Sequence, residues 1–131
     1  MNISEIAKKT NISTDTLRYY ERIGLIPPVP RKSSGIRIYD ERFVQWIEMI
    51  QNLKSIGMPL EKIIDYMALA QRGSATSTQR RDLIAELQAE LRLKISALQS
   101  MLSRTNYQLD NYEEILLPQT SELMQHWHTA V

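Results

Sequence analysis

The chain has 131 residues, a formal net charge of +1 and no cysteine. A chain of this length forms one domain, or a small domain with an extension. Without cysteine it cannot build thiolate metal sites, disulfides or a cysteine-based redox sensor. Its apolar content of 43% is too high for a disordered chain, and no apolar run reaches the roughly 18 residues of a membrane span. We therefore expect a soluble, cytoplasmic protein with no membrane association, no metal and no cofactor.

Basic residues are concentrated in the first part of the chain. Residues 1–75 hold 11 of the 16 Lys and Arg residues, against 8 acidic residues. Six of these cations fall within 25 residues: Arg18, Arg22, Arg31, Lys32, Arg37 and Arg42. Such a cluster can supply several phosphate contacts. The charge distribution therefore indicates nucleic-acid binding by the N-terminal part.

Residues 2–10 and 13–24 predict a helix-turn-helix. Asn11 tolerates the left-handed backbone of a sharp turn, Ser13 is a good N-cap for the second helix, and Gly24 suits the position that ends it. Two packed helices need an apolar inner face. That face is supplied by Ile3, Ile6, Ala7, Ile12 and Leu17.

Residues 25–39 predict a small two-stranded wing. The segment holds three of the five prolines, which exclude a helix and a central strand, and a Ser-Ser-Gly turn before the alternating sequence IRIY. Side chains alternate across a strand. We therefore expect Ile36 and Ile38 to pack inward, and Arg37 and Tyr39 to face a nucleic acid.

Two more helices follow the wing. Asp40 caps a helix that runs to Gly57, and Pro59 starts another that runs toward Gly73. Their apolar stripes predict burial. The first stripe is Phe43, Ile47, Ile50 and Leu53, and the second is Leu60, Ile63, Ile64 and Met67.

A long helix is predicted over residues 79–117, after a break at residues 73–78, because no Gly or Pro occurs in between. Apolar residues recur every three or four positions, which is typical of a coiled-coil seam. The helix would be roughly 55 Å long and too long to bury against the preceding part, so it needs a partner. Dimerisation is expected through Leu87, Leu91, Ile95, Leu98, Leu102, Leu109 and Tyr112. The domains are then residues 1–75, the helix 76–117 and a tail 118–131.

Three stretches together carry a family resemblance: ISEIAKKTNISTDTLRYYERIGLIPP, GIRIYDE and GMPLEKI. Over residues 1 to about 72 the chain resembles the MerR-type transcriptional regulators. The resemblance implies a mainly α fold, with a winged helix-turn-helix head followed by a long antiparallel coiled-coil dimerisation helix. It also implies a homodimer that binds double-stranded promoter DNA and distorts it, so that RNA polymerase is affected through the DNA.

The resemblance further implies which residues touch DNA, with the helix from Ser13 in the major groove. Arg commonly reads guanine, whereas hydroxyl groups mostly bind phosphates, but the sequence leaves open which residue does which. The candidate DNA contacts are Thr14, Thr16, Arg18, Tyr19 and Tyr20 in the helix, Arg37 and Tyr39 in the wing, and Lys62 in a second wing.

Two departures from the family leave the inducer unassigned: the chain has no cysteine sensor and no large domain after the long helix. A small-molecule inducer could occupy a pocket between the tail and the partner's head, using Tyr107, Tyr112 or Trp127. An alternative function is an adaptor that uses the seam to bind another protein and keeps the winged head only as a fold. No nucleophile-base set or phosphate loop is present, so we expect no enzyme activity.

Overall fold

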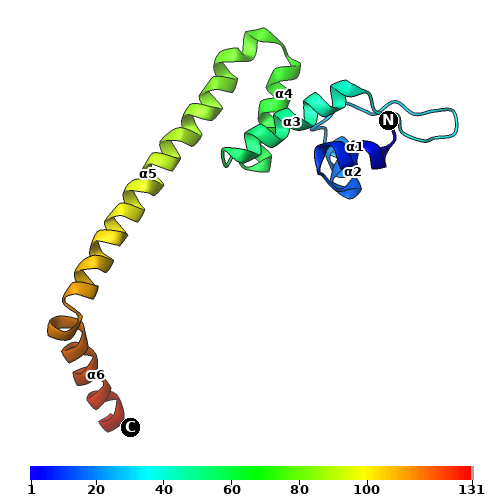
Figure 1. Ribbon diagram of the computed structural model, residues 1–131. Helices are drawn as coiled ribbons and strands as arrows, with labels where there is room; N and C mark the ends of the chain where they lie inside the picture. The colour runs from blue at the N-terminus through cyan, green and yellow to red at the C-terminus, as the bar shows by residue number, and fades with distance from the viewer. Residues whose placement is uncertain (131) are drawn as a thin grey trace. The chain divides into compact units, whose positions relative to one another are not determined.

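The computed structural model describes residues 1–130 and consists of helices joined by turns and one long loop (Figure 1). It forms two compact units, Met1–Leu87 and a second one from Gln88 onward. The boundary predicted at residue 75 thus falls inside the first unit, and the last residue of the tail predicted over 118–131 lies outside the described part. None of the described helices is both long and apolar enough to cross a membrane.

The first unit opens with the predicted helix-turn-helix, formed by α1 (Ile3–Thr10) and α2 (Thr14–Arg22). Asn11 adopts the left-handed conformation, with φ of 57° and ψ of 40°. The Ser13 hydroxyl caps α2 by accepting a hydrogen bond from the Thr16 amide at 3.1 Å. Gly24 follows α2 with a φ of 79°, which favours glycine. The local signals that predicted the turn are therefore the ones that form it.

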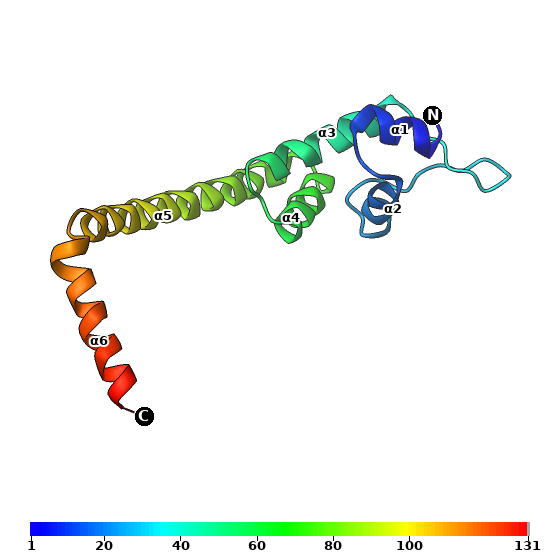
Figure 2. The ribbon, with the colours of Figure 1, turned by 60° about the horizontal axis from the view of Figure 1, so that its bottom comes forward.

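The two predicted helices after the wing are α3 (Glu41–Ser55) and α4 (Leu60–Gln71). The Asp40 carboxylate caps α3 by accepting a hydrogen bond from the Arg42 amide at 2.9 Å. Helix α1 packs against both α2 and α3, and α3 packs against α4 (Figure 2). The core between them includes Ile6, Leu17, Phe43, Ile47, Ile50, Leu53, Ile63 and Met67.

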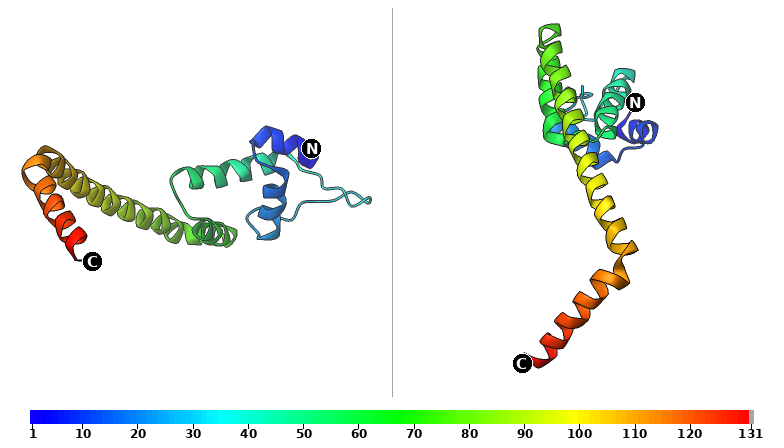
Figure 3. Two further views of the ribbon diagram at one scale, coloured as in Figure 1. Left: turned by 90° about the horizontal axis from the view of Figure 1, so that it is seen from below. Right: turned by 90° about the vertical axis from the view of Figure 1, so that its left-hand side faces the viewer.

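The wing between α2 and α3 is an extended loop (Figure 3) that holds an isolated antiparallel bridge between Arg31 and Arg37 instead of two strands. The predicted inward packing of its isoleucines is wrong, because Ile36 and Ile38 are 58% and 38% exposed while Tyr39 is 1% exposed.

Contacts distant in sequence cause this reversal. The Tyr39 amide donates a hydrogen bond to the Met1 carbonyl at 2.7 Å, and the Met1 amino group donates one to the Tyr39 carbonyl at 2.6 Å. The Tyr39 ring meets Phe43 edge-on at 5.4 Å between ring centroids. Pairing with the chain start and with α3 therefore turns Tyr39 inward and leaves the isoleucines outside.

Helix α5 (Ser77–Asp110) follows a short 3-10 turn, Ser74–Thr76, and starts two residues earlier than predicted. Its first turns belong to the first unit, where Leu83 and Leu87 pack against the core. Leu87 is only 9% exposed. Leu87, which was predicted as a dimerisation residue, is therefore covered within its own unit.

In the second unit α5 ends at Asp110, and a π-helical turn, Tyr112–Leu116, leads into α6 (Leu117–Thr129). The prediction of an unbroken helix to residue 117 is wrong. The break begins at Asn111, whose backbone leaves the helical region with φ of −111° and ψ of 20°. Pro118 lies in the first turn of α6, where its missing N–H is tolerated.

The remaining seam residues are exposed in the second unit. Apolar side chains of this size usually lie in a core or an interface. Their exposed fractions are 40% for Leu91, 54% for Ile95, 63% for Leu98, 60% for Leu102, 73% for Leu109 and 44% for Tyr112.

Candidate nucleic-acid interface

The outward face of α2 carries four of the eight predicted contact residues. Thr14 and Thr16 are half-buried in its first turn, whereas Arg18 and Tyr19 are exposed. The Arg18 guanidinium forms an ion pair with Asp15 at 3.1 Å, on an exposed surface where such a pair is weak. Arg18 can therefore exchange this partner for a phosphate or a base at little cost.

Arg22 extends the same face by one more turn. Its guanidinium lies 5.2 Å from the centre of the Tyr19 ring, and the side chain is exposed. Arg22 was not among the predicted contacts, although its position three residues after Tyr19 places both on one side of a helix. The α2 surface therefore offers two arginines and an aromatic ring.

Tyr20 points the other way. Although it was predicted as a DNA contact together with Tyr19, it is only 3% exposed. Its hydroxyl oxygen accepts a hydrogen bond from Lys54 at 3.4 Å. Its ring therefore packs in the core, and only the hydroxyl end reaches the surface.

That hydroxyl lines a groove of about 510 Å³ between the start of α2 and the end of α3. The groove combines hydroxyl groups, amides and one cation beside a helix N-terminus, which is a chemistry suited to an anion. Lys54 in this groove was missed from sequence because it lies 34 positions from Tyr20. The lining residues are Asn11, Ile12, Ser13, Thr16, Tyr20, Gln51, Lys54 and Ser55.

The tip of the wing presents Arg31 and Lys32, both exposed. The Lys32 amide donates a hydrogen bond to the Ile36 carbonyl, and the Gly35 amide donates one to the Lys32 carbonyl, each at 2.8 Å. Gly35 has a φ of 86°, which a residue with a side chain rarely adopts. The turn thus holds two cations at the end of the loop.

Arg37 joins the wing to α2. Its Nε atom donates a hydrogen bond to Glu21 Oε1 at 2.8 Å, and Glu21 Oε2 accepts one from the Val29 amide at 3.0 Å. Burial alone would raise the pKa of Glu21, but the Arg37 hydrogen bond, the Val29 amide and the positive charges of Arg37 and Arg31 lower that pKa below its ordinary value. The carboxylate is therefore charged at neutral pH.

Two predicted contacts lie apart from this surface. Tyr39 is buried, and among the described residues its hydroxyl has no hydrogen-bond partner; burial raises the pKa of this hydroxyl. Lys62 is half-buried in the first turn of α4. The structure therefore gathers Thr14, Thr16, Arg18 and Tyr19 on α2 and connects Arg37 to that helix, whereas Tyr39 is covered.

The predicted inducer residues are not brought together within one chain. Trp127 is 67% exposed and lines a shallow hollow on α6. Tyr107 and Tyr112 are 57% and 44% exposed and do not line it. The other lining residues of the hollow are Leu123, Met124, His126 and Ala130.

A helix-turn-helix with a basic wing and two exposed arginines on its second helix is typical of a DNA-binding regulator of the winged helix-turn-helix class. Residues 1–70 match the family model described as MerR HTH family regulatory protein, and residues 44–104 match the one described as MerR, DNA binding. The chain belongs to the MerR family of transcriptional regulators. It is a DNA-binding regulator of transcription and not an enzyme.

Individual relatives agree with this assignment. The HTH-type transcriptional regulator AdhR of Bacillus subtilis (strain 168) is 46% identical over 86 residues, which cover 66% of this chain and 61% of AdhR. The chain thus spans less than two thirds of the length of that relative.

Two solved structures resemble the chain more fully. A MerR family transcriptional regulator from Listeria monocytogenes is 37% identical, with a TM-score of 0.65, covering 100% of this chain and 99% of its own. HiNmlR, a MerR family regulator lacking the sensor domain and bound to promoter DNA, is 30% identical, with a TM-score of 0.61. The match covers 87% of this chain and 86% of the HiNmlR chain. The predicted family, mainly α fold and regulatory function are confirmed, and these relatives give no support to the alternative of an adaptor.

Proposed function

We propose that the chain acts as a homodimer that places two α2 helices in the major groove at two half-sites of one promoter. The observation that carries this proposal is the exposed seam of α5 from Leu91 to Leu109. A single recognition helix reads only a few base pairs, so sequence-specific binding needs a second head. Antiparallel pairing of two α5 helices supplies that head and covers the seam.

In this proposal the outward face of α2 reads the DNA. Thr14, Thr16, Arg18 and Tyr19 contact bases or phosphates, and Arg22 adds a phosphate contact beside Tyr19. The exposure of the α2 side chains and the weak ion pair of Arg18 support these roles.

The wings are proposed to hold the DNA backbone on either side of α2. Arg37 contacts a phosphate through the guanidinium nitrogens that Glu21 does not use, and Lys62 contacts the backbone from a second wing at the start of α4. Tyr20 and Tyr39 act mainly by packing, since both rings are buried.

The regulator is proposed to act by bending and untwisting the promoter, so that RNA polymerase responds to the altered DNA without direct contact. Deformation of this kind requires firm contacts at both half-sites. A small-molecule inducer would bind between the tail and the partner's head, using Tyr107, Tyr112 or Trp127, and the exposed apolar hollow on α6 supports a role for Trp127.

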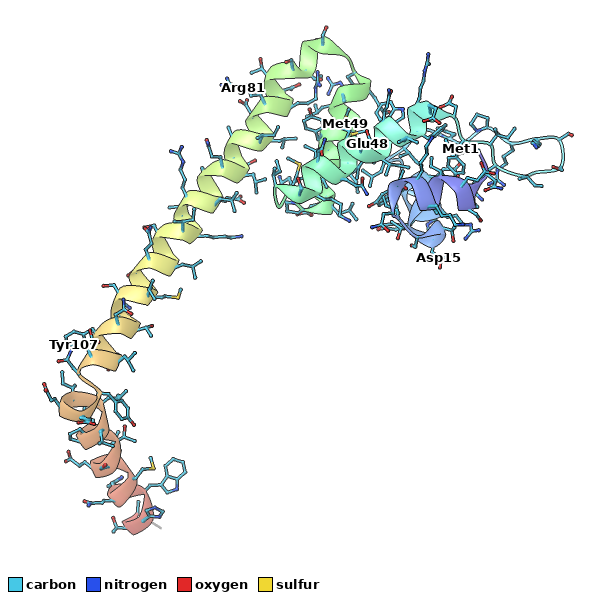
Figure 4. All side chains as sticks on the ribbon, in the orientation of Figure 1. Met1, Asp15, Glu48, Met49, Arg81 and Tyr107 are labelled. Carbon is cyan, nitrogen blue, oxygen red and sulfur yellow. The ribbon has the colours of Figure 1, made fainter. Side chains whose placement is uncertain are left out.

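The test is selection of a preferred duplex from a random-sequence library, followed by titration of that duplex by fluorescence anisotropy at several salt concentrations. We expect a preferred sequence, a dimer on the DNA and a steep fall in affinity with salt. Arg18→Ala should weaken binding at least about tenfold. Arg81→Ala, an exposed arginine on α5 (Figure 4), is the matched control and should have little effect. Absence of any sequence preference would exclude the proposal.

A further inference from the structure

The carboxylate of Glu21 links the recognition helix to both limbs of the wing, the segment that leads into the tip of the wing and the segment that returns from it. Glu21 lies in the last turn of α2, and each of its two oxygens accepts one hydrogen bond. Oε2 accepts from the Val29 amide at 3.0 Å, where the chain enters the wing, and Oε1 accepts from Arg37 at 2.8 Å, where the chain returns. Among the described residues, no other α2 side chain hydrogen-bonds to both limbs of the wing.

This arrangement is largely shielded from water. The side chains of Glu21 and Arg37 are only 17% and 24% exposed, whereas those of the Asp15–Arg18 pair on the same helix are 94% and 47% exposed. Hydrogen bonds between charged groups are stronger than neutral ones, and shielding reduces their screening by solvent. The Glu21 pair can therefore hold a geometry that the Asp15 pair cannot.

Other contacts hold the base of the wing and pair its limbs. At the base, Val29 and Tyr39 are buried in the core of the first unit. The isolated bridge between Arg31 and Arg37 joins the two limbs through two backbone hydrogen bonds, from the Lys32 amide to the Ile36 carbonyl and from the Ile38 amide to the Pro30 carbonyl, each at 2.8 Å. The isoleucines on its surface are exposed and contribute little packing. Beyond this base, Glu21 is the side chain of α2 that hydrogen-bonds directly to both limbs, so it links the orientation of the wing to that of the recognition helix.

We propose that Glu21 is a positioning residue for DNA binding. Its carboxylate holds the wing in a fixed position relative to α2 before DNA binds. Because the wing is already in position, Arg31 and Lys32 can contact the DNA backbone while α2 occupies the major groove. No ordering of the wing is then needed on binding. This inference rests on the proposed mode of binding by α2 and the wing.

The direction in which one substitution changes the affinity for DNA distinguishes a positioning role from a purely electrostatic effect. A carboxylate near a polyanion repels it, so neutralising an acidic residue without a positioning role should leave DNA affinity unchanged or increase it. Glu21→Gln keeps the side-chain length but has one acceptor oxygen for two donors, and its NH₂ group opposes the other donor. A positioning role therefore predicts weaker binding despite the loss of a negative charge.

The experiment measures the affinity of the full chain for the duplex recovered by selection from a random-sequence library. Glu21→Gln should bind about tenfold more weakly than the unmodified chain, a cost typical of a broken charged hydrogen bond. Asp15→Asn, the matched control, removes the other α2 carboxylate that pairs with an arginine. It should bind equally well or more tightly.

Hydroxyl-radical footprinting shows whether the weaker DNA binding of Glu21→Gln comes from the wing. With Glu21→Gln, the backbone protection that flanks the α2 contacts should be lost, while protection at the α2 contacts persists. Thermal unfolding shows whether the variant is folded. If Glu21→Gln does not fold, Glu21→Asp decides, because the shorter side chain keeps the charge but cannot keep both hydrogen bonds, to the Val29 amide and to Arg37, and it should lose the same flanking protection.

Two results would overturn the inference. One is binding by Glu21→Gln that equals or exceeds that of the unmodified chain, and the other is a uniform loss of protection over the whole site. If the unmodified chain itself shows no sequence preference, the proposed function fails instead, and that result is visible before any variant is made.

Discussion

The two compact units of this chain differ in whether they bury their own apolar residues. In Met1–Leu87 the helices cover one another, and residues such as Ile6, Ile47 and Ile63 have no exposed surface. From Gln88 onward no described residue is buried, although leucines recur at regular intervals. Hydrophobic burial is the main force that stabilises a fold. The first unit thus has its own source of stability, and the second depends on a surface outside it.

The transition between the two environments occurs within one turn of α5. Leu87 is 9% exposed and packs in the core of the first unit, while Leu91, four residues later, is 40% exposed. The same spacing and residue type therefore serve two purposes along one helix. This contrast can be tested by substitutions on each side of it.

The largest effect is expected from two charges on the seam. Leu98→Glu combined with Leu102→Glu should abolish the dimer and weaken binding to the selected duplex by at least about a hundredfold, because carboxylates are costly in an apolar interface and one head alone binds weakly. Sedimentation and anisotropy would measure both effects. The control, Gln99→Glu with Ser100→Glu, adds the same charge off the seam. An intact dimer in the seam variant would show that residues 91–109 are not the interface.

A smaller effect is expected where the two units meet in sequence. Leu87→Ala should lower the free energy of unfolding of the head by about 2 kcal/mol, the low end for a buried leucine. Leu91→Ala should instead raise the dimer dissociation constant and leave the head nearly unchanged. Urea unfolding followed by Trp46 fluorescence, in a Trp127→Phe background, would report on the head alone. If both variants destabilised the head equally, the proposed difference between Leu87 as a core residue and Leu91 as an interface residue would be wrong.

Acid should weaken the first unit through Glu21. Its pKa in the folded chain lies below the ordinary value of 4.5, so its contribution to stability is fully present above 4.5 and is lost as the pH falls through the lower folded pKa. The difference in unfolding free energy between the unmodified chain and Glu21→Gln should therefore shrink below pH 4.5. Urea titrations over an acid series would measure it, and a difference independent of pH would contradict the assignment.

The smallest effect is expected at Tyr39. Because its hydroxyl is buried without a hydrogen-bond partner among the described residues, Tyr39→Phe should leave stability unchanged or slightly raised, and DNA affinity unchanged. Thermal unfolding and anisotropy would measure these quantities. Tyr19→Phe is the matched comparison, since Tyr19 is 37% exposed on α2 and should lose affinity. Weaker DNA binding by Tyr39→Phe would restore this residue as a direct contact.

The parts of the fold that were predicted correctly depend on interactions between near neighbours in the chain. The caps at Ser13 and Asp40 and the left-handed Asn11 act within a few residues, so the sequence alone located these helix ends. The buried stripe of α3 follows from helical spacing in the same way. The resemblance to the MerR family then supplied the candidate contacts on α2, of which the structure leaves Arg18 and Tyr19 exposed and Thr14 and Thr16 half-buried, whereas Tyr20 is buried.

Other features required the folded chain, because they arise between residues far apart in sequence. Pairing of Tyr39 with Met1 reversed the faces of the wing, and Lys54 reached Tyr20 across 34 positions. Burial of Leu87 depended on the position of the core, which helical periodicity does not contain. The connection of Glu21 to Arg37 has the same origin. The sequence by itself therefore determined the local elements and the family, whereas tertiary packing decided which side chains are free to meet DNA or a partner.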